Sequence, residues 1–380
     1  MGATALPPVT ERAPERGRIA LVLPDLRPGG VERVRLLLAH EFVQRGYAVD
    51  LVLMQARGEL LQEVGPNVEV VDLQAARIRQ LPFALAAYLR RRRPEALMAA
   101  MWPLTGVAVL ARVLAGWQGR LLVSEHNTLT RTPAYRGLSG GLHRAFGRWL
   151  YGHADAVVCV SQGVADDIAT ATGVARERLH IVHNPIRKPS AEGATDPDIM
   201  RWWAQDGTRL ISIGSLKAQK DHATLLHALA RLRQRRPARL LILGEGELRT
   251  ELEAQARALG VQDSILMPGF VTDPYPYLAG ADLFVLSSAW EGLGNVITEA
   301  LAVGTPVVST DCPSGPAEIL EQGRFGRLAP VGDPQALARA IEAALDAPVD
   351  AALLKSRAAD FSVERAADQY LGLLDLGATP

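Results

Sequence analysis

The chain has 380 residues, of which 48% are hydrophobic and 22% charged, and its formal net charge is zero. This composition is typical of a globular protein of two ordinary domains and excludes an intrinsically disordered chain. Two cysteines are too few for a disulfide framework or a cysteine metal site, which favours a reducing compartment. The first residues lack the apolar core of a signal peptide, and no apolar run is long enough to span a bilayer. We therefore expect a cytoplasmic protein, either soluble or peripherally attached to a membrane.

The two halves of the chain differ in charge. Residues 1–190 carry 24 Lys and Arg against 16 Asp and Glu, whereas the remainder carries 17 against 25. A basic first half indicates an anionic partner there, such as a lipid phosphate, a membrane surface or nucleic acid. Frequent arginine codons in a GC-rich genome would explain the same excess.

Strand-like and helix-like segments alternate through the first half. Residues 1–17 are Pro-rich and charged without periodicity, and we predict a disordered leader there. Strands are predicted at 18–24, 48–54, 68–71, 96–100, 120–124, 156–160 and 179–182, and helices at 31–45, 81–92, 104–115 and 141–151. This order is typical of a parallel sheet with helices on both faces.

A second series of alternating segments follows a stretch rich in Pro, Gly and Asp, which we predict to be a linker over 189–208. Its strands are predicted at 210–214, 239–244, 265–267, 283–286 and 306–310, and its helices at 223–234, 248–259, 296–303 and 334–345. A last helix is predicted at 363–376. The predicted fold is α/β, with two Rossmann-like doubly wound domains at 18–188 and 209–360, a cleft between them and a C-terminal segment at 361–380.

Two carboxylates, Glu291 and Glu299, flank a glycine-bearing segment between a predicted strand and a predicted helix. Gly294 lets the backbone approach a ligand closely, and Asn295 is expected to cap the helix. Free amides at a helix N-terminus bind anions. Because carboxylates repel phosphate, the two glutamates are better suited to sugar hydroxyls. The alternative is that neither glutamate binds a ligand, one being solvated and the other lying on the helix surface, since this would give the same spacing.

Other candidate residues also follow predicted strands, where ligands bind in such sheets. His126 follows the strand at 120–124, although a structural hydrogen bond would account for a single histidine. Lys220 precedes a helix and can neutralise a phosphate leaving group, although alone it would be a solvated surface charge. Gly29 and Gly30 form a phosphate-compatible turn, which is weak evidence and not a dinucleotide-binding Gly-x-Gly-x-x-Gly.

Several short motifs occur in one order over residues 18–335: Pro28-Gly-Gly-Val-Glu32, Glu125-His-Asn127, 214–220, Leu243-Gly-Glu-Gly246, Met267-Pro-Gly-Phe270, 291–299, Pro313-Ser-Gly-Pro-Ala-Glu318, Gly326 and Gly332-Asp333. Each is weak alone, but the ordered set is specific. By these motifs the chain resembles the retaining glycosyltransferases of family four, which have the GT-B architecture of two facing Rossmann-like domains.

The resemblance implies a nucleotide-sugar donor held by the C-terminal domain and an acceptor held by the N-terminal domain. It implies that Glu299 binds the ribose, that Glu291 contacts the donor hexose, and that His126 lies near the transferred sugar. It also implies that the final helix packs back on the first domain. The catalytic residues are then Glu291, Lys220 and His126, and the donor-binding residues are Gly29, Gly30, Gly214, Ser215, Phe270, Leu293, Gly294, Asn295, Val296 and Glu299.

One residue departs from the family pattern. Many members have an arginine after the glycine that corresponds to Gly214, whereas this chain has Ser215. A hydroxyl donates one hydrogen bond to phosphate but brings no charge. Lys217 is a candidate for the missing cation, and the loss bears on rate and donor choice.

No cofactor and no metal are expected, since the substrate itself is a nucleotide-diphosphate sugar, with a UDP-sugar favoured. The one Asp-x-Asp, formed by Asp196 and Asp198, lies in the predicted linker, and we interpret it as a turn. Retention of configuration is implied by the family alone. A nucleotide-sugar 2-epimerase of the same fold and a non-catalytic sugar-nucleotide-binding module remain alternatives.

The expected acceptor is a saccharide or a polyprenyl-linked saccharide, at the inner face of a bacterial plasma membrane, with a soluble acceptor as alternative; no nucleic acid is expected. Four arginines, 90–93, end a segment with an apolar stripe that could lie on an anionic membrane. An ordinary helix with a basic C-terminus has the same pattern. Further positive charge near the predicted acceptor loops comes from Arg131, Arg136, Arg144 and Arg148.

Overall fold

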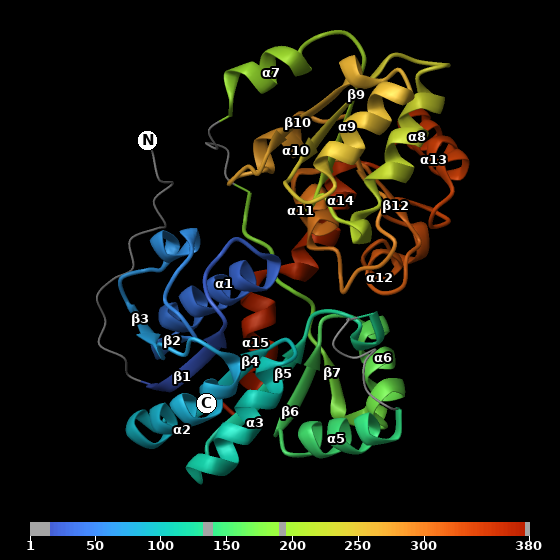
Figure 1. Ribbon diagram of the computed structural model, residues 1–380. Helices are drawn as coiled ribbons and strands as arrows, with labels where there is room; N and C mark the ends of the chain where they lie inside the picture. The colour runs from blue at the N-terminus through green and yellow to red at the C-terminus, as the bar shows by residue number, and fades with distance from the viewer. Residues whose placement is uncertain (1–15, 132–139, 190–194, 377–380) are drawn as a thin grey trace. The chain divides into compact units, whose positions relative to one another are not determined.

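The computed structural model describes residues 16–131, 140–189 and 195–376 (Figure 1). The chain divides into two compact units. Unit 1 consists of residues up to Ile186 together with Ser362–Pro380, and unit 2 of Arg187–Phe361. Each unit is a sheet of parallel strands covered by helices.

The sheet of unit 1 has seven parallel strands in the order β3-β2-β1-β4-β5-β6-β7. Its strands are β1 (Arg16–Leu23), β2 (Tyr47–Leu53), β3 (Val68–Asp72), β4 (Ala96–Ala100), β5 (Arg120–Glu125), β6 (Ala156–Cys159) and β7 (Leu179–Ile181). The central strands are nearly continuous apolar runs because both of their faces are buried, and every residue from Ile19 to Leu23 is fully buried.

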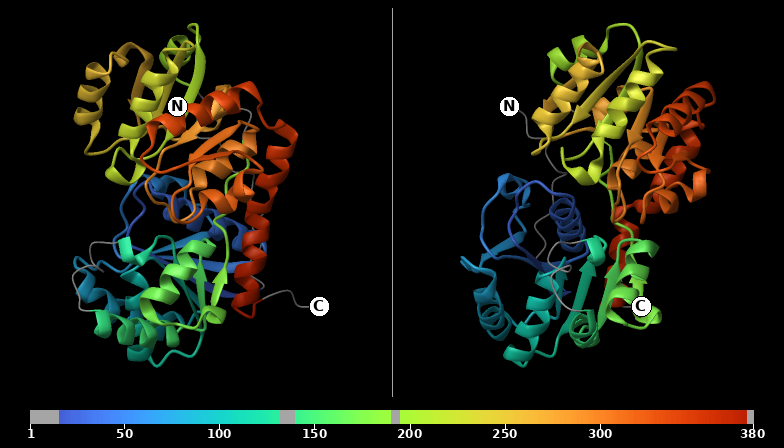
Figure 2. Two further views of the ribbon diagram at one scale, coloured as in Figure 1. Left: turned by 90° about the vertical axis from the view of Figure 1, so that its right-hand side faces the viewer. Right: turned by 45° about the vertical axis from the view of Figure 1, so that its right-hand side comes forward.

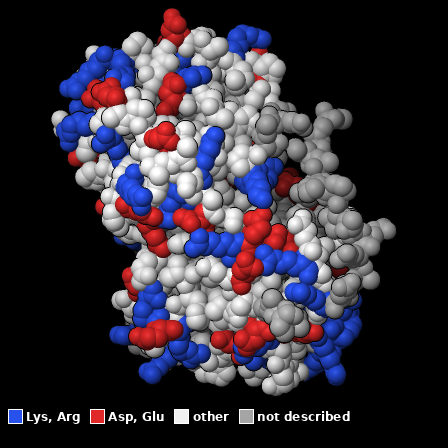
Figure 3. Space-filling model, turned by 180° about the vertical axis from the view of Figure 1, so that it is seen from behind, with Lys and Arg blue, Asp and Glu red and all other residues white. Residues whose placement is uncertain are grey.

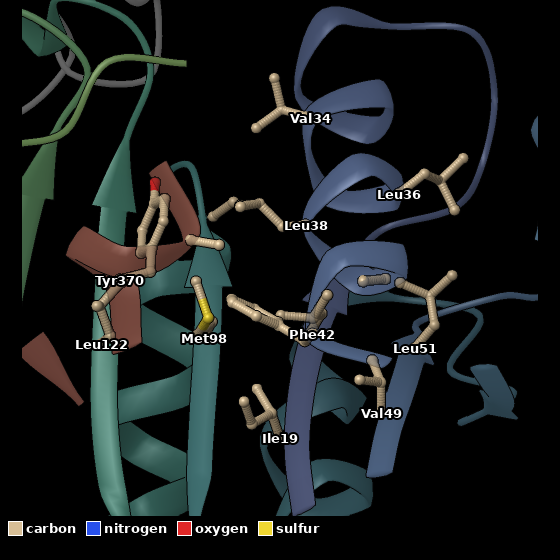
Figure 4. Close-up of a cluster of buried hydrophobic side chains, with 14 of the residues drawn as sticks. Ile19, Val34, Leu36, Leu38, Phe42, Val49, Leu51, Met98, Leu122 and Tyr370 are labelled. Carbon is tan, nitrogen blue, oxygen red and sulfur yellow. The ribbon is translucent and has the colours of Figure 1, made fainter. Parts of the chain in front are cut away.

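Helices of unit 1 connect these strands: α1 (Gly30–Gln44), α2 (Leu81–Arg92), α3 (Leu104–Ala115), α5 (Gly140–Gly152), α6 (Gln162–Thr172) and α15 (Val363–Leu373). The last of them returns from the C-terminal end of the chain and packs on α1. Figure 2 shows α15, in red, beside the strands of unit 1. Phe42 of α1 and Tyr370 of α15 meet Ile19, Met98 and Leu122 of the sheet in one apolar core (Figure 4).

The sheet of unit 2 has six parallel strands in the order β10-β9-β8-β11-β12-β13. These are β8 (Thr208–Ile213), β9 (Ala238–Leu243), β10 (Ile265–Gly269), β11 (Leu283–Leu286), β12 (Val307–Thr310) and β13 (Arg327–Ala329). Its helices are α7 (Pro197–Trp203), α8 (His222–Leu232), α9 (Arg249–Ala258), α10 (Tyr275–Gly280), α11 (Asn295–Val303), α12 (Pro316–Ile319), α13 (Pro334–Asp346) and α14 (Ala351–Ala358). Leucines from α8 and α13 pack against the strands as the core of this unit.

The predicted α/β class with two doubly wound parallel sheets is confirmed, and the twelve predicted strands are all present within about two residues at either end. Strand β13 was not predicted, because its three residues are too few to show a period. Residues 16 and 17, predicted as leader, already belong to β1, while the rest of that segment lies outside the described residues. The predicted linker also contains a helix, α7, of seven residues.

Asp196 makes the predicted turn, in which its side chain accepts a hydrogen bond from the amide two residues on, and the same turn begins a helix. Its carboxylate accepts hydrogen bonds from the amides of Asp198 and Ile199, so it is the N-cap of α7. Pro197 at the first helical position fits the same helix start, since it lacks the amide hydrogen that would have no partner there. The spacing Asp-Pro-Asp is therefore a helix-start signal in this chain.

The predicted membrane-facing stripe on α2 is also corrected. Leu81, Leu85, Tyr88 and Leu89 are buried in unit 1, and the Tyr88 hydroxyl donates to buried Asp50 at 2.7 Å. Of that stripe only one side chain, Phe83, is exposed, at 68%. The basic end of the helix remains at the surface, and Figure 3 shows Lys and Arg gathered at the lower right, the side on which α2 lies.

Candidate functional site

In unit 2, two loops that carry predicted site residues lie next to each other. They follow β8 and β11, which are neighbours in the sheet, so both loops emerge at its carboxyl edge. The amide of Ala289 donates to the carbonyl of Gln219 at 2.8 Å, and the Gln219 side chain donates to the carbonyl of Trp290 at 3.0 Å. Ser287 Oγ donates to the carbonyl of Lys220 at 2.8 Å. These bonds fix the two loops to one another.

Lys220 and Glu291 form an ion pair across these loops. Lys220 Nζ lies 2.5 Å from Glu291 Oε1, and Ser288 Oγ donates to the same carboxylate oxygen at 2.6 Å. Only 15% of the lysine side chain and 7% of the glutamate side chain are exposed. Burial and the charge of Glu291 together raise the pKa of the neighbouring Cys312 thiol to about 12. The structure thus brings together two of the predicted catalytic residues.

Gly214 lies beneath the stem of Lys220. A Cβ atom at this position would be 3.0 Å from Lys220 Cε, so any side chain would press on the lysine. Gly244 in turn packs on Gly214, because a Cβ at residue 244 would be 2.0 Å from the Gly214 carbonyl oxygen. The absence of side chains at these two positions therefore sets the position of the lysine.

Helix α11 begins at the same edge, after Gly294. Asn295 was predicted as its N-cap, and this is wrong: Gly294 is the N-cap, with φ of 92° and no side-chain hydrogen bond to the helix, and Asn295 is the first helical residue. A positive φ favours glycine, which explains the residue type. No side-chain hydrogen bond caps this start, and the positive end of the α11 dipole favours an anion there. Leu293 is buried just before them and Glu299 is half-buried one turn later.

Gly315 supports this loop from the next connection. Its φ is 91°, and a Cβ there would be 2.0 Å from the carbonyl oxygen of Leu293. The backbone of residue 315 therefore packs directly against the segment that begins α11. The motif that contains this glycine is visible in the sequence, but its contact with Leu293 is not.

The loop after β8 has one buried histidine that the sequence analysis did not single out. His222 begins α8 and is 3% exposed, and burial together with the charge of Lys220 lowers its pKa to about 4. Ser215 is half-buried in this loop and Lys217 is exposed. Among the residues that the structure describes at this edge, the buried histidine is thus neutral and Lys220 is the cation paired with Glu291.

Two main-chain carbonyls in the segment that leads to Phe270, a predicted donor-binding residue, already accept hydrogen bonds. Arg249 Nη1 donates to the carbonyl of Met267 at 3.0 Å, and the amide of Gly244 donates to the carbonyl of Gly269 at 2.9 Å. Phe270 follows with 54% of its surface exposed. This exposed aromatic ring at the end of β10 is a flat apolar surface of the kind on which a base can stack.

The remaining predicted residues lie in unit 1. Gly29 is the N-cap of α1 and Gly30 its first residue, and burial raises the pKa of Glu32 in the same turn. His126 follows β5 and is 5% exposed, with Nε2 3.1 Å from Ser124 Oγ. Burial and the charge of Arg35 lower its pKa well below the usual value, an effect that Asn184 opposes.

Within the described part of the chain, no group of three or more His, Cys, Asp or Glu side chains is arranged to hold a metal ion. No described helix is both long and apolar enough to cross a membrane. Arg131, Arg144 and Arg148 are exposed, and Arg136 lies outside the described residues.

Family models match both units. Residues 28–188 match "Glycosyltransferase Family 4", and residues 207–347 match "Glycosyl transferases group 1". The two ranges together cover most of the chain and contain all of the site residues named above.

Individual relatives agree with these models. An N-acetylgalactosaminyltransferase of Campylobacter jejuni that acts on a diphospho-undecaprenol-linked saccharide is 30% identical over 63% of this chain and 64% of its own length. The lipopolysaccharide core biosynthesis glycosyltransferase LpsE of Rhizobium meliloti is 29% identical over 92% of this chain and 96% of its own length.

Solved structures share the fold. Anabaena HepE in complex with UDP and glucose has a TM-score of 0.75 at 22% identity, with 95% of this chain and all of that chain covered. The apo form of the lipopolysaccharide outer core galactosyltransferase WaaB has a TM-score of 0.72 at 18% identity, over 94% and 99% of the two chains. The chain therefore belongs to the family 4 glycosyltransferases, which have the GT-B fold.

Proposed function

We propose that this protein transfers a hexosyl or N-acetylhexosaminyl unit from a nucleotide-diphosphate sugar to a saccharide or lipid-linked saccharide, with retention of configuration, in the synthesis of a cell-surface polysaccharide or glycolipid. The observation that carries the proposal is the Lys220–Glu291 pair at the carboxyl edge of unit 2, beside the uncapped N-terminus of α11. A cation, a carboxylate and the positive end of a helix dipole meet there, on two loops that are hydrogen-bonded to each other.

Each part of this edge matches the charge that develops during transfer. Cleavage of the anomeric C–O bond leaves negative charge on the diphosphate and positive charge on the sugar. Lys220 and the first amides of α11 are held in place before the reaction, so they stabilise the diphosphate without reorganising. Glu291 and Glu299 offer acceptors to sugar hydroxyls, which carry donors that a phosphate lacks. Ser215, in place of an arginine, leaves Lys220 as the main cation for the leaving group.

The donor and acceptor classes rest on the relatives. The Campylobacter enzyme transfers N-acetylgalactosamine to a diphospho-undecaprenol-linked saccharide, and LpsE acts in lipopolysaccharide core synthesis. We infer an acceptor of the same general class and favour a UDP-sugar as donor. Both of these relatives are glycosyltransferases, which favours transfer over the epimerase and the binding module.

A metal is not required by this account, because Lys220 and the α11 amides supply the positive charge at the diphosphate. We expect release of nucleoside diphosphate from a panel of UDP-, GDP- and ADP-sugars to persist in excess EDTA when a suitable acceptor is present. Chromatography of the nucleotides measures it, with added Mn²⁺ as the comparison. Strict dependence on Mn²⁺, or no turnover of any donor, would contradict the proposal.

A lipid-linked acceptor requires access to a membrane, and α5 offers a surface for it. Phe146 and Trp149 are 49% and 41% exposed and stack with ring centroids 6.0 Å apart. Arg144 and Arg148 are exposed on the same helix. Phe83 of α2, a helix that packs on α3, is also exposed. The sequences of α2, α3 and α5 contain six arginines and no Asp or Glu. Aromatic side chains among arginines suit an anionic lipid surface.

We expect the protein to sediment with vesicles that contain phosphatidylglycerol and not with vesicles of phosphatidylcholine alone. Phe146→Ser with Trp149→Ser should weaken this binding about tenfold, because the buried aromatic area supplies much of the affinity. Leu353→Ser removes an apolar side chain of similar exposure (39%) from unit 2 and should have no effect. Equal sedimentation with both vesicles, or none with either, would remove the membrane from the proposal.

A further inference from the structure

Arg35, in the second turn of α1, is completely buried in unit 1. Its Nη2 donates to Ser124 Oγ, and its guanidinium carbon lies 5.5 Å from the centre of the Tyr370 ring. Its Nε and Nη1 have no hydrogen bond of normal geometry among the described residues, and the group that offsets its burial is the Tyr370 side chain and no described carboxylate. Burying a cation without a counter-ion lowers the folding stability, so we infer that Arg35 has a role other than stabilising the fold.

Glu125, the residue after Ser124 in β5, does not face Arg35. Successive side chains of a strand point to opposite faces, and Ser124 and Glu125 do so here. Glu125 accepts hydrogen bonds from Thr105 Oγ1 at 3.0 Å and from the Tyr151 hydroxyl at 2.9 Å, on α3 and α5. Arg35 and Ser124 therefore lie on the other face, toward α1 and α15, where His126 Nε2 shares the next hydrogen bond with Ser124 Oγ.

The directions of the hydrogen bonds that link Arg35, Ser124 and His126 follow from which groups can donate. Arginine only donates, so Ser124 Oγ accepts from Arg35 and keeps one hydrogen to give. That hydrogen has two acceptors within reach, His126 Nε2 at 3.1 Å and the Ala99 carbonyl at 3.4 Å. The shorter contact favours the histidine. A ring that accepts at Nε2 carries its own hydrogen on Nδ1.

We propose that Arg35 is a positioning residue, which acts through Ser124 to hold the His126 ring neutral with its proton on Nδ1. His126 then offers one fixed donor at the carboxyl edge of the unit 1 sheet. A neutral ring there avoids repulsion with the positive charge that develops on the transferred sugar. The catalytic consequence rests on the proposed function, whereas the state of the ring does not.

The charges around the ring support the same assignment. Burial and the nearby positive charge of Arg35 both lower the pKa of His126, and Asn184 acts in the opposite direction. From α15, Tyr370 faces Arg35, and burial raises the pKa of its phenol, so it stays uncharged at neutral pH. From β6, burial raises the pKa of Cys159 to about 12. No acid described around the ring therefore favours the imidazolium.

Arg35→Met tests the proposal through the ring itself. In protein labelled with ¹⁵N-histidine, with the His126 signals assigned by their loss in His126→Gln, we expect the wild-type ring to show one neutral tautomer between pH 5.5 and 8. In Arg35→Met, we expect the ring to titrate within this range and to mix tautomers. Ser124→Ala keeps the charge of Arg35, so we expect mixed tautomers without the titration. Arg35→Lys, which restores the charge, should suppress the titration again.

Arg45→Met is the matched control. Arg45 also lies next to α1 and also binds α15, through Asp368 and the Glu364 carbonyl, but it has no contact with His126 or Ser124. We expect it to lower the melting temperature and to leave the His126 signals unchanged, whereas Arg35→Met should leave the melting temperature equal or higher.

Activity of Arg35→Met should fall most at the acidic end of its pH profile. An unchanged His126 tautomer and pKa in Arg35→Met, or in Ser124→Ala if Arg35→Met does not fold, would overturn the proposal. Loss of activity with an unchanged ring would do the same.

Discussion

Replacing Lys220 with Met is expected to lower kcat/KM for sugar transfer by about 10²- to 10³-fold, the effect of removing one preorganised donor from a developing anion. The side chain is held by Gly214 beneath its stem and by Glu291 at its end, so its ammonium needs no reorganisation. Steady-state kinetics with the preferred donor measures the change. Lys217→Met, which removes an exposed lysine of the same loop, should cost less than about tenfold.

Lys220→Met also leaves the buried carboxylate of Glu291 without its cation. Breaking a buried pair costs about 3 kcal/mol of unfolding free energy, because the remaining charge is poorly solvated. Glu291→Gln in the Lys220→Met background should recover most of that stability but none of the activity. If the double variant regains activity along with stability, or if Lys220→Met keeps activity within tenfold of the wild type, the role given to the lysine is wrong.

Gly315→Ala is expected to lower the unfolding free energy by about 3 kcal/mol or more and to abolish detectable donor binding. The new Cβ would overlap the carbonyl oxygen of Leu293, at 2.0 Å, and so displace the segment that begins α11. The positive φ of 91° adds a further backbone cost of about 1 kcal/mol. Chemical denaturation and calorimetric titration measure the two effects.

Gly323→Ala separates these two causes. Gly323 has a similar φ of 101°, but a Cβ there would have nothing within 4 Å. We expect it to cost only about 1 kcal/mol and to leave donor binding intact. Equal effects of the two substitutions would show that backbone strain, and not the contact with Leu293, explains the result.

Much of the fold could be predicted because parallel strands buried on both faces appear as apolar runs. The strands at 96–100 and 283–286 were predicted to the residue for this reason. Short elements with little periodicity, such as β13 and α12, could not be. The apolar residues of α2 show the limit of a pattern: they mark a buried face, and the sequence does not say whether protein or lipid covers it.

The site could be predicted in part. Residues at the ends of neighbouring strands were expected to meet, and Lys220 and Glu291 do so. Their partner Ser288 and the packing of Gly315 depend on tertiary contacts with no local signal. Arg35 was hidden for the same reason, since an arginine in an amphipathic helix looks like a surface charge until its burial is known.

We propose above all that the carboxyl edge of unit 2 binds a nucleotide-diphosphate sugar. The most direct measurement is the thermal stability of the wild type and of Glu299→Ala with a panel of UDP-, GDP- and ADP-sugars. We expect one nucleotide class to raise the Tm of the wild type by several degrees and to leave that of Glu299→Ala unchanged, because the bound ligand stabilises only the folded state that can hold its ribose. No shift with any donor, or the same shift in both proteins, would contradict this account.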